Sequence, residues 1–190
     1  MCLGEDDVLF MLCAQVQPAM ERSDMAALHV RGFSDPDWPQ AWAIIRAVSA
    51  AGDTFTYPVD LAEDQARGIW IRPPPGRTAV AVDSRGSVLG TSQMGPNKMG
   101  PGGHVATASF MVADGHRGSG VGRRLVLDAL EWAGESGYRG MQFNAVAETN
   151  RVAIALYRAL GFEIVGTVPE GFLHPQEGYV SLCIMYKPLG

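Results

Sequence analysis

The sequence predicts a mixed α/β (α+β) fold, in which one sheet is covered by helices on both faces. Apolar stretches of strand character alternate with stretches at helical spacing, in the order β, α, α, β, β, β, α, β, α, β, β, with a short extra helix in the first half. This order is typical of mixed sheets with helical layers. The chain has 190 residues, of which 47% are hydrophobic, enough to build one proper core. We therefore expect a single domain over residues 1–190.

The first half of the chain is expected to hold one strand and three helices. Ser23 predicts a helix start, because its hydroxyl can accept a free amide of the first turn. Gly52 predicts a helix end, since glycine readily adopts the left-handed conformation there. A proline run over 73–76 then breaks the chain. The expected strand covers residues 9–17, and the expected helices cover 24–33, 38–51 and 62–69.

The second half has a more regular pattern of strands and helices. The turn at 83–86 predicts a β-hairpin between the segments 78–82 and 87–93, and residues 94–103 form a loop rich in glycine and proline. Arg124 and Asp128 stand four residues apart on a helix, so we expect an ion pair between them. The remaining strands are expected at 105–112, 141–146, 163–168 and 179–186, and the helices at 120–136 and 151–160.

Charge and cysteine content exclude several functions and compartments. The 15 basic and 20 acidic residues give a net charge of −5, which argues against nucleic acid and against an anionic membrane surface as partners. Cys2, Cys13 and Cys183 are few and scattered, so we expect a reducing, cytoplasmic location. No apolar run has the length of a membrane span. We expect no metal site.

A glycine-rich turn, Arg117 to Gly122, stands between the strand 105–112 and the helix that follows it. Glycine allows the backbone to approach a ligand closely. The first amides of a helix lack internal partners and lie at the positive end of its dipole. Arg117, Arg123 and Arg124 add positive charge. The turn therefore predicts a phosphate-binding site.

Three phosphate-binding patterns can be compared with this turn. A Walker A loop requires Gly-Lys-Ser or Gly-Lys-Thr, which is absent from the sequence. A dinucleotide fingerprint starting at Gly118 would need a third glycine at the position of Arg123. The pattern that fits is R-x-x-G-x-G, formed by Arg117, Gly120 and Gly122. It resembles the pyrophosphate loop of the GNAT superfamily of acetyltransferases, which bind acetyl-CoA.

A second motif strengthens this resemblance. Residues 150–162 read N-x-x-A-x-x-L-Y-x-x-L-G-F, similar to the second cofactor segment of the same superfamily. The resemblance covers about residues 78–186, the expected cofactor-binding half, and implies the GNAT fold, a twisted mixed sheet of six or seven strands with helices on both faces. A narrower likeness, through Phe143-Asn144, Asn150 and the segment 166–169, is to the branch that contains fungal acetyltransferases acting on proline analogues. Uncharacterised bacterial members of the superfamily match as well.

The resemblance implies which residues bind acetyl-CoA. The turn amides would hold the pyrophosphate, main-chain groups of one strand would bind the pantetheine arm like an added strand, and the side chain of Asn150 would contact that arm. A main-chain N–H near Met111 or Val112 would stabilise the oxyanion. The cofactor residues expected on this basis are Phe110, Met111, Val112, Arg117, Gly118, Ser119, Gly120, Val121, Gly122, Arg123, Asn150, Ala153 and Tyr157.

Two residues are expected to carry proton transfer. Tyr157 matches the general acid of the superfamily, which protonates the departing thiolate, although a tyrosine there can also serve only to pack the helix. The amine acceptor needs a base or a water relay, for which Glu148 is a candidate at the end of the strand 141–146. A solvated loop carboxylate is the alternative for Glu148. His104 and His174 are weaker candidates for the base.

The acceptor is expected to enter opposite the cofactor. Phe55 and Tyr57, in an irregular aromatic segment, would wall its pocket, and Asn97 and Asn144 would supply polar contacts. Since Phe143 and Asn144 are adjacent in a strand, they point to opposite faces. Hydrophobic cover for the aromatic residues, and loop or edge hydrogen bonding for the amides, remain equally open.

These features predict an acetyl-CoA-dependent N-acetyltransferase that acts on the amine of a small molecule, such as an amino or imino acid. An antibiotic or a protein N-terminus is an alternative acceptor. A coenzyme A-binding sensor without turnover is an alternative of another class. The resemblance also implies a homodimer, which is common among such proteins.

Overall fold

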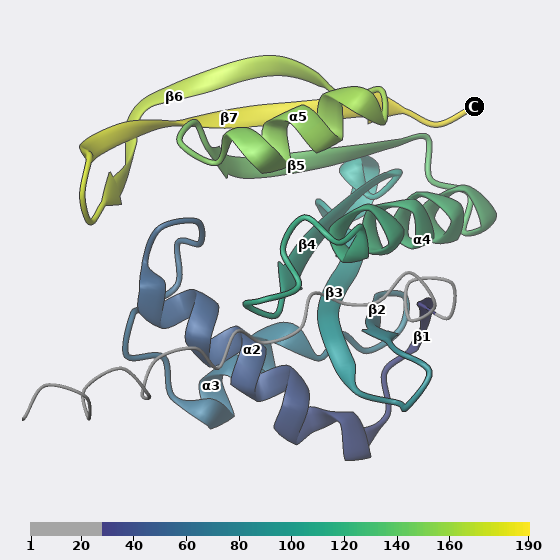
Figure 1. Cartoon of the computed structure of the whole chain (residues 1–190). Coiled ribbons are helices and arrows are strands. Elements are labelled where there is room, and N and C mark those ends of the chain that lie inside the picture. The colour runs from purple at the N-terminus through teal and green to yellow at the C-terminus, as the bar shows by residue number, and fades with distance from the viewer. Residues whose placement is uncertain (1–27) are drawn as a thin grey trace, which may run out of the picture.

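The computed structural model describes residues 28–190 (Figure 1). The strand expected at 9–17, the Ser23 cap, Cys2 and Cys13 lie outside the described residues. The described chain forms a seven-stranded mixed sheet in the order β1-β2-β3-β4-β5-β7-β6. Its strands are His29–Gly32 (β1), Arg77–Val82 (β2), Val88–Pro96 (β3), Val105–Val112 (β4), Gly140–Ala147 (β5), Glu163–His174 (β6) and Gly178–Pro188 (β7).

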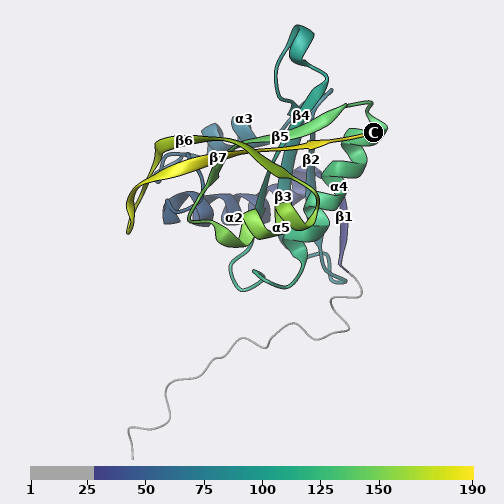
Figure 2. The same cartoon turned by 90° about the horizontal axis from the view of Figure 1, so that it is seen from above.

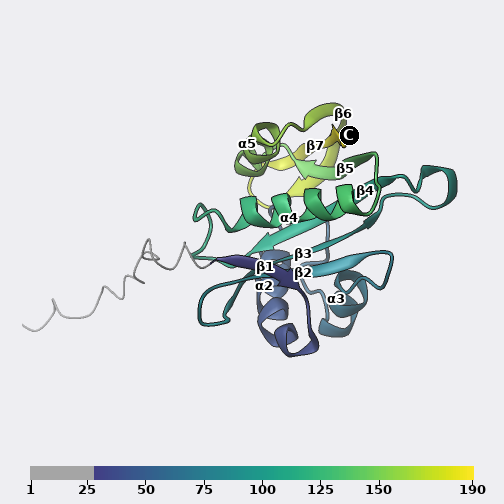
Figure 3. The same ribbon diagram turned by 90° about the vertical axis from the view of Figure 1, so that its right-hand side faces the viewer.

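Helices cover both faces of this sheet. Helices α2 and α3 lie on one face and α4 on the other, while α5 packs beside β5 and β7 (Figure 3). The helices are Trp38–Ala51 (α2), Glu63–Trp70 (α3), Val121–Glu135 (α4) and Arg151–Ala159 (α5), with short 3₁₀ turns at Asp35–Asp37 and Gly100–Gly102. None of the helices described here is long and apolar enough to cross a membrane.

Several expected boundaries are confirmed. Helix α2 spans the expected residues and ends at Gly52, whose φ of 63° is left-handed and whose N–H donates to the Ser49 carbonyl at 3.1 Å. Strand β4 also has the expected bounds. Strand β6 is longer than expected, because its pairing with β7 resumes at Phe172 after an irregularity that begins at Val168.

The helix expected at 24–33 is wrong for its described part. Residues 29–32 are a strand that pairs antiparallel with β2, from His29 opposite Val82 to Gly32 opposite Ala79. As a helix, this segment would leave the outer edge of β2 without hydrogen-bond partners. Sheet pairing therefore overrides the local helix signal.

The ion pair expected within α4 is also wrong. Asp128 accepts two hydrogen bonds from Arg77, at 2.8 and 3.0 Å. Because Arg77 lies on β2, this bidentate pair links α4 to the sheet and does not link one turn of α4 to the next.

The sheet opens in its middle, and this opening positions the site. Strands β4 and β5 are parallel neighbours, but only Val105–Gly140 and Ala106–Met141 pair between them. Strand β5 also changes register against β7 between Phe143 and Val146. Beyond these two pairs, β4 and β5 diverge. Their facing edges are then free of sheet hydrogen bonds, which must be satisfied by something else.

The hairpin of β6 and β7 extends the sheet well beyond α5. Its far end projects to the left of α5 in both Figure 1 and Figure 2. Leu173 and Tyr179, near that end, are 63% and 69% exposed, whereas Phe172 packs with Ala147 and Val180 in a small core of its own.

Candidate functional site

A cleft of about 670 Å³ occupies the opening between β4 and β5. Strand β4 and the segment Thr54–Tyr57 form one side, and β5 with α5 forms the other. The glycine turn before α4 closes one end. Among residues 28–190, no group of three or more His, Cys, Asp or Glu side chains is placed to hold a metal ion.

The glycine turn presents free amides to the cleft. Gly118 and Gly120 have φ values of 77° and 88°, which favour glycine, and a side chain at either would meet nothing within 4 Å. The first helical hydrogen bond of α4 runs from the Arg124 N–H to the Gly120 carbonyl at 3.1 Å. The preceding amides therefore have no helical acceptor. With Arg117 and Arg123 beside them, they suit a pyrophosphate.

Two turn residues point elsewhere. The Ser119 hydroxyl donates to the His116 carbonyl at 2.6 Å, and the Val121 side chain is fully buried in the core. Neither side chain lines the cleft. Any contact that Val121 makes with a phosphate is therefore through the main chain, whereas the Ser119 N–H already donates to the His116 carbonyl at 3.4 Å.

Strand β4 offers alternate main-chain groups to the cleft. Its register with β3 is constant, and at the two ends Asn97 donates to Val105 at 2.8 Å and Ala113 donates to Leu89 at 2.9 Å. Because hydrogen bonds alternate in an antiparallel pair, the odd-numbered residues bond to β3 and the even-numbered residues face β5. Phe110 and Val112 thus present main-chain groups to the cleft.

Met111 is a correction to the expected set. The same alternation directs its main-chain groups to Thr91 on β3. Its side chain lines the cleft floor but is only 2% exposed. Main-chain binding of a ligand by Met111 is therefore not supported by this register.

Asn150 begins α5 at the cleft. Its side-chain oxygen accepts a hydrogen bond from the Ala153 N–H at 3.2 Å, which caps the helix. The cap uses the oxygen, so the NH₂ group is left to donate to a ligand. Ala153 lines the cleft with it.

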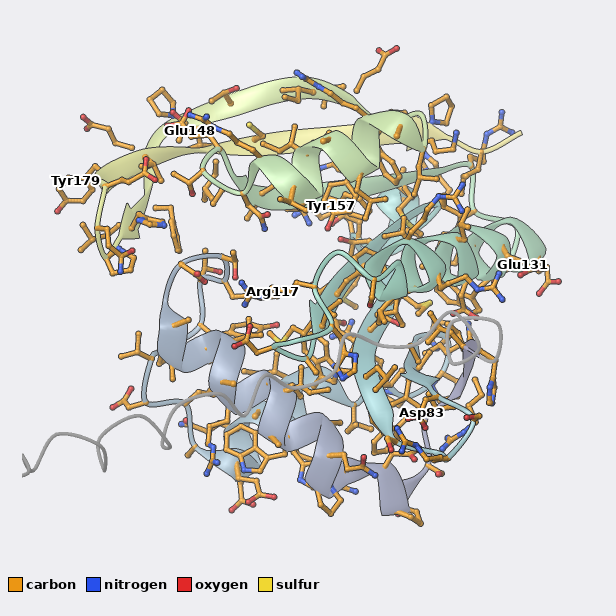
Figure 4. All side chains as sticks on the ribbon, viewed as in Figure 1. Asp83, Arg117, Glu131, Glu148, Tyr157 and Tyr179 are labelled. Carbon is orange, nitrogen blue, oxygen red and sulfur yellow. The ribbon has the colours of Figure 1, made fainter. Side chains whose placement is uncertain are left out.

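Tyr157 lies on α5, about two turns beyond Asn150, and faces the cleft (Figure 4). Its ring contacts those of Phe143, Phe162 and Phe110, with centroids 4.5, 5.9 and 6.3 Å away. Burial in this cluster raises the pKa of the Tyr157 hydroxyl above its ordinary value. The phenol therefore keeps its proton throughout the neutral range.

Glu148, the candidate base, does not lie in the same cleft as Tyr157, the expected acid. Its carboxylate accepts the Ser181 N–H at 2.7 Å, and its own N–H donates to the Ser181 carbonyl at 3.0 Å. It lines a smaller, separate cavity with Thr149, Arg151 and Glu177. Figure 4 shows Glu148 at the far end of α5 from Tyr157.

The two histidines considered as bases also lie outside the cleft lining. His104 contacts the Pro101 carbonyl at 3.0 Å, and His174 accepts the N–H groups of Gln176 and Glu177 in the hairpin turn. Among residues 28–190, no Asp or Glu lines the main cleft.

The aromatic segment that was expected to border an acceptor pocket lies along the cleft. Phe55 packs on Tyr57 and on buried Trp70, with ring centroids 5.4 and 6.3 Å apart. Burial raises the pKa of Tyr57, and the nearby charge of Arg72 partly opposes this. Both Phe55 and Tyr57 line the cleft.

Asn144 and Phe143 point to opposite faces of β5, as expected. Phe143 is 3% exposed and packs in the core, whereas Asn144 is exposed, and both border the cleft. The Asn144 amide donates to Asn97 at 2.7 Å and accepts from Gln142 at 2.8 Å. Asn97 does not line the cleft, so the direct polar contact expected from it is not supported, and it contacts the lining only through its hydrogen bond with Asn144.

Sequence reasoning missed several lining residues. Thr107 and Ser109 stand on β4 with their side chains on the same face, and both line the cleft. Their alternation with Ala106 and Ala108 is a period-two signal that could have identified them. His116, just before the turn, lines the cleft as well.

Comparison with known proteins gives one consistent family. The family described as Acetyltransferase (GNAT) family matches residues 42–162. N-acetyltransferase aca1 of Schizosaccharomyces pombe is 34% identical over 113 residues, which is 59% of this chain and 54% of aca1. The chain thus spans about half the length of that relative.

Two further proteins are similar over more of their length. The L-methionine sulfoximine/L-methionine sulfone acetyltransferase of Pseudomonas aeruginosa is 37% identical over 149 residues, covering 74% of this chain and 83% of that protein. The structure of a GCN5-related N-acetyltransferase from Kribbella flavida is 52% identical, with a TM-score of 0.84 over 86% of this chain and 99% of that one.

Proposed function

This chain belongs to the GNAT family of acetyltransferases, and from that premise we propose that it moves the acetyl group of acetyl-CoA to the amine of a small amino acid or amino-acid analogue. Solved proteins of the same fold hold acetyl-CoA, the acetyl donor of this family. The similar Pseudomonas enzyme, whose name gives two methionine derivatives as acceptors, supports the choice of acceptor. A single domain over 1–190, with its cofactor half at about 78–186, a cytoplasmic location and a homodimer are parts of the same proposal.

The observation that carries the proposal is the divergence of β4 and β5. It leaves an unpaired strand edge that runs toward a helix N-terminus with free amides. An extended arm ending in a pyrophosphate is complementary to such a surface, because the arm can pair with the edge while the phosphates meet the amides. The residues present therefore fit coenzyme A.

The even-numbered residues of β4 indicate which main-chain groups would bind the arm. The main-chain groups of Phe110 and Val112 face the cleft and would hold the pantetheine arm. We assign the oxyanion contact to the Val112 N–H rather than to Met111, since only the former faces the cleft. Such binding would direct the thioester toward Tyr157, which lines the same cleft.

Tyr157 is the proposed general acid. When the amine attacks the carbonyl, the C–S bond breaks and the sulfur needs a proton. An ordinary phenol, with a pKa of about 10, is a weaker acid than a thiol with a pKa of about 8.5, so this proton transfer is uphill and requires the two groups to be held close. Burial keeps the Tyr157 phenol protonated, and because it raises the pKa it makes close placement of the sulfur still more important.

The acceptor amine loses its proton to water in this proposal. No carboxylate of residues 28–190 lines the cleft, and Glu148 bonds to Ser181 instead. Small amines are partly unprotonated near their own pKa values, so we expect the rate to rise with pH through the pKa of the acceptor. If a protein group served as the base, the rate would instead rise with pH through the pKa of that group.

An amine screen with detection of released thiol tests the proposal. We expect turnover with amino acids and their analogues, L-methionine sulfone among them. Turnover only with an aminoglycoside-type antibiotic or a peptide N-terminus would replace the acceptor. Binding of acetyl-CoA without thiol release from any amine would contradict the enzymatic role and favour a sensor.

A further inference from the structure

Arg72 does not itself line the cleft, but its guanidinium lies close to residues that do, in a position fixed by the backbone. It follows α3, and its N–H donates to the Thr78 hydroxyl at 2.9 Å, while that hydroxyl donates to the Trp70 carbonyl at 2.9 Å. This buried link anchors residue 72 to strand β2. The side chain beyond it is exposed.

The guanidinium of Arg72 lies over a glycine of β3. A Cβ atom added to Gly95 would be 3.4 Å from Nη2 of Arg72 and 3.7 Å from Nε. Any larger side chain would therefore occupy the place where the guanidinium lies. Glycine at this position leaves that place open.

This place is on the face of the sheet that carries the acceptor side of the cleft. Gly95 is directly opposite Thr107 of β4, so a side chain at either position stands on the same face. Ser109 follows two residues later on that face and accepts a hydrogen bond from Gln93 at 3.2 Å. Thr107 and Ser109 line the cleft, as does Tyr57, which feels the charge of Arg72.

Arg72 differs from neighbouring arginines in its lack of a carboxylate partner. Arg31, Arg67 and Arg77 each pair with an aspartate, at 2.7, 2.6 and 2.8 Å. Within the described part of the chain, no ion pair is formed by Arg72. An arginine beside a cleft without acidic residues is a suitable partner for an anionic group of a ligand.

We propose that Arg72 binds the carboxylate of the acceptor, so that this enzyme selects amino acids over amines that lack a carboxylate. The inference rests on the proposed function, because it names the residue that chooses the acceptor. The planar guanidinium holds both carboxylate oxygens, and the hydroxyl groups of Tyr57, Thr107 and Ser109 lie on the same side. The amine of the acceptor is then directed toward the thioester.

Two acceptors and three variants test this assignment. L-methionine sulfone carries the carboxylate, and its carboxamide has the same shape without the charge. For Arg72→Gln, we expect kcat/KM with the acid to fall about tenfold or more, through KM, and kcat/KM with the carboxamide to stay within about twofold. Arg46→Gln, which removes an exposed arginine of α2, should change neither. Arg72→Lys should retain part of the preference.

Equal losses for both acceptors, or no loss for either, would overturn the role of Arg72. If the wild-type protein acetylates neither, the proposed acceptor class fails, and calorimetric titration of L-methionine sulfone into the protein saturated with coenzyme A decides about Arg72 separately. Weaker binding by Arg72→Gln than by the wild type supports the assignment. Equal binding, or no binding by the wild type, contradicts it.

Discussion

Tyr157 shows how one environment serves both packing and chemistry. The rings of Phe143, Phe162 and Phe110 pack around it, and burial of its hydroxyl among them raises the pKa of that hydroxyl. The two roles that sequence analysis left open for this tyrosine are therefore compatible. A substitution that removes the hydroxyl and keeps the ring distinguishes the role in proton transfer from the role in packing.

Replacing Tyr157 by Phe should lower kcat by about 10- to 1,000-fold, because the proton donor is lost while the ring contacts remain. The affinity for acetyl-CoA should change little, as measured by calorimetric titration. Since the pKa of Tyr157 is raised, the wild-type kcat should not fall between pH 7 and 10 through loss of this proton.

Tyr179→Phe is the matched control, since Tyr179 is 69% exposed at the far end of the hairpin (Figure 4). Its kcat should equal that of the wild type. An unchanged kcat in Tyr157→Phe would show that the thiolate takes its proton from water.

Asp37 illustrates a purely structural charge. Hydrogen bonds from Arg31, at 2.7 Å to each carboxylate oxygen, are the main cause that lowers the pKa of Asp37 to about 2, and the N–H and hydroxyl of Ser34 add two more at 2.8 and 2.9 Å. A lowered pKa means that the stabilisation is present above the ordinary value of 3.8 and is lost as the pH falls through about 2.

Asp37→Asn should therefore lower the free energy of unfolding by about 1–2 kcal/mol at pH 7. The difference from the wild type should shrink between pH 4 and pH 2, in urea denaturation at each pH. Asp35→Asn is the control, because Asp35 is 84% exposed in its pair with Arg67 and should change stability by less than about 0.5 kcal/mol. A pH-independent difference would contradict the role of the charge.

At the scale of elements, helix α5 combines a cap with a ligand contact in one residue. The oxygen of Asn150 caps the helix, and its NH₂ group faces the proposed pantetheine arm. Different substitutions should separate these two roles, because serine caps a helix but has a shorter side chain than asparagine.

Asn150→Ala should destabilise the protein by about 1 kcal/mol and weaken acetyl-CoA binding. Asn150→Ser should keep most of the stability and still weaken binding severalfold, because only the ligand contact is lost. Thermal unfolding and calorimetric titration measure the two effects. Wild-type affinity in Asn150→Ser would show that Asn150 acts on the helix alone.

Elements with local signals could be predicted from sequence, and those set by distant partners could not. Helix α2 and strand β4 were predicted to the residue, because Gly52 marks the helix end and a run of small and apolar residues marks the strand. Residues 29–32 were expected to be helical, because their strand depends on β2, some 50 residues away. Asp128 likewise bonds to Arg77 instead of to its helical neighbour.

The same distinction holds for the site. The glycine turn and the start of α5 carry local motifs, and both line the cleft. Glu148 was a candidate base only because it follows the strand at the expected site, whereas its position beside β7 gives its carboxylate to the Ser181 N–H. No local pattern marks Arg72, whose relation to the cleft depends on a glycine in another strand.

At the scale of the whole molecule, the sheet consists of two halves joined by two residue pairs between β4 and β5. Acetyl-CoA should bridge these halves and raise the melting temperature; at a hundredfold excess over Kd the stabilisation is about 2.7 kcal/mol. Hydrogen exchange should slow at the amides of Phe110 and Val112 and at the turn amides. NAD is the control ligand, and stabilisation by NAD without stabilisation by acetyl-CoA would contradict the cofactor assignment.

The short connection between β4 and β5 also bears on turnover. Each half of the sheet keeps its own ladders, since β1 to β4 pair in sequence and β5, β7 and β6 pair with one another. A small rotation about the two shared pairs would widen the opening without breaking a ladder in either half, and it would be opposed mainly by the core that both halves share with α4. Opening of the cleft would then not require any strand or helix to unfold.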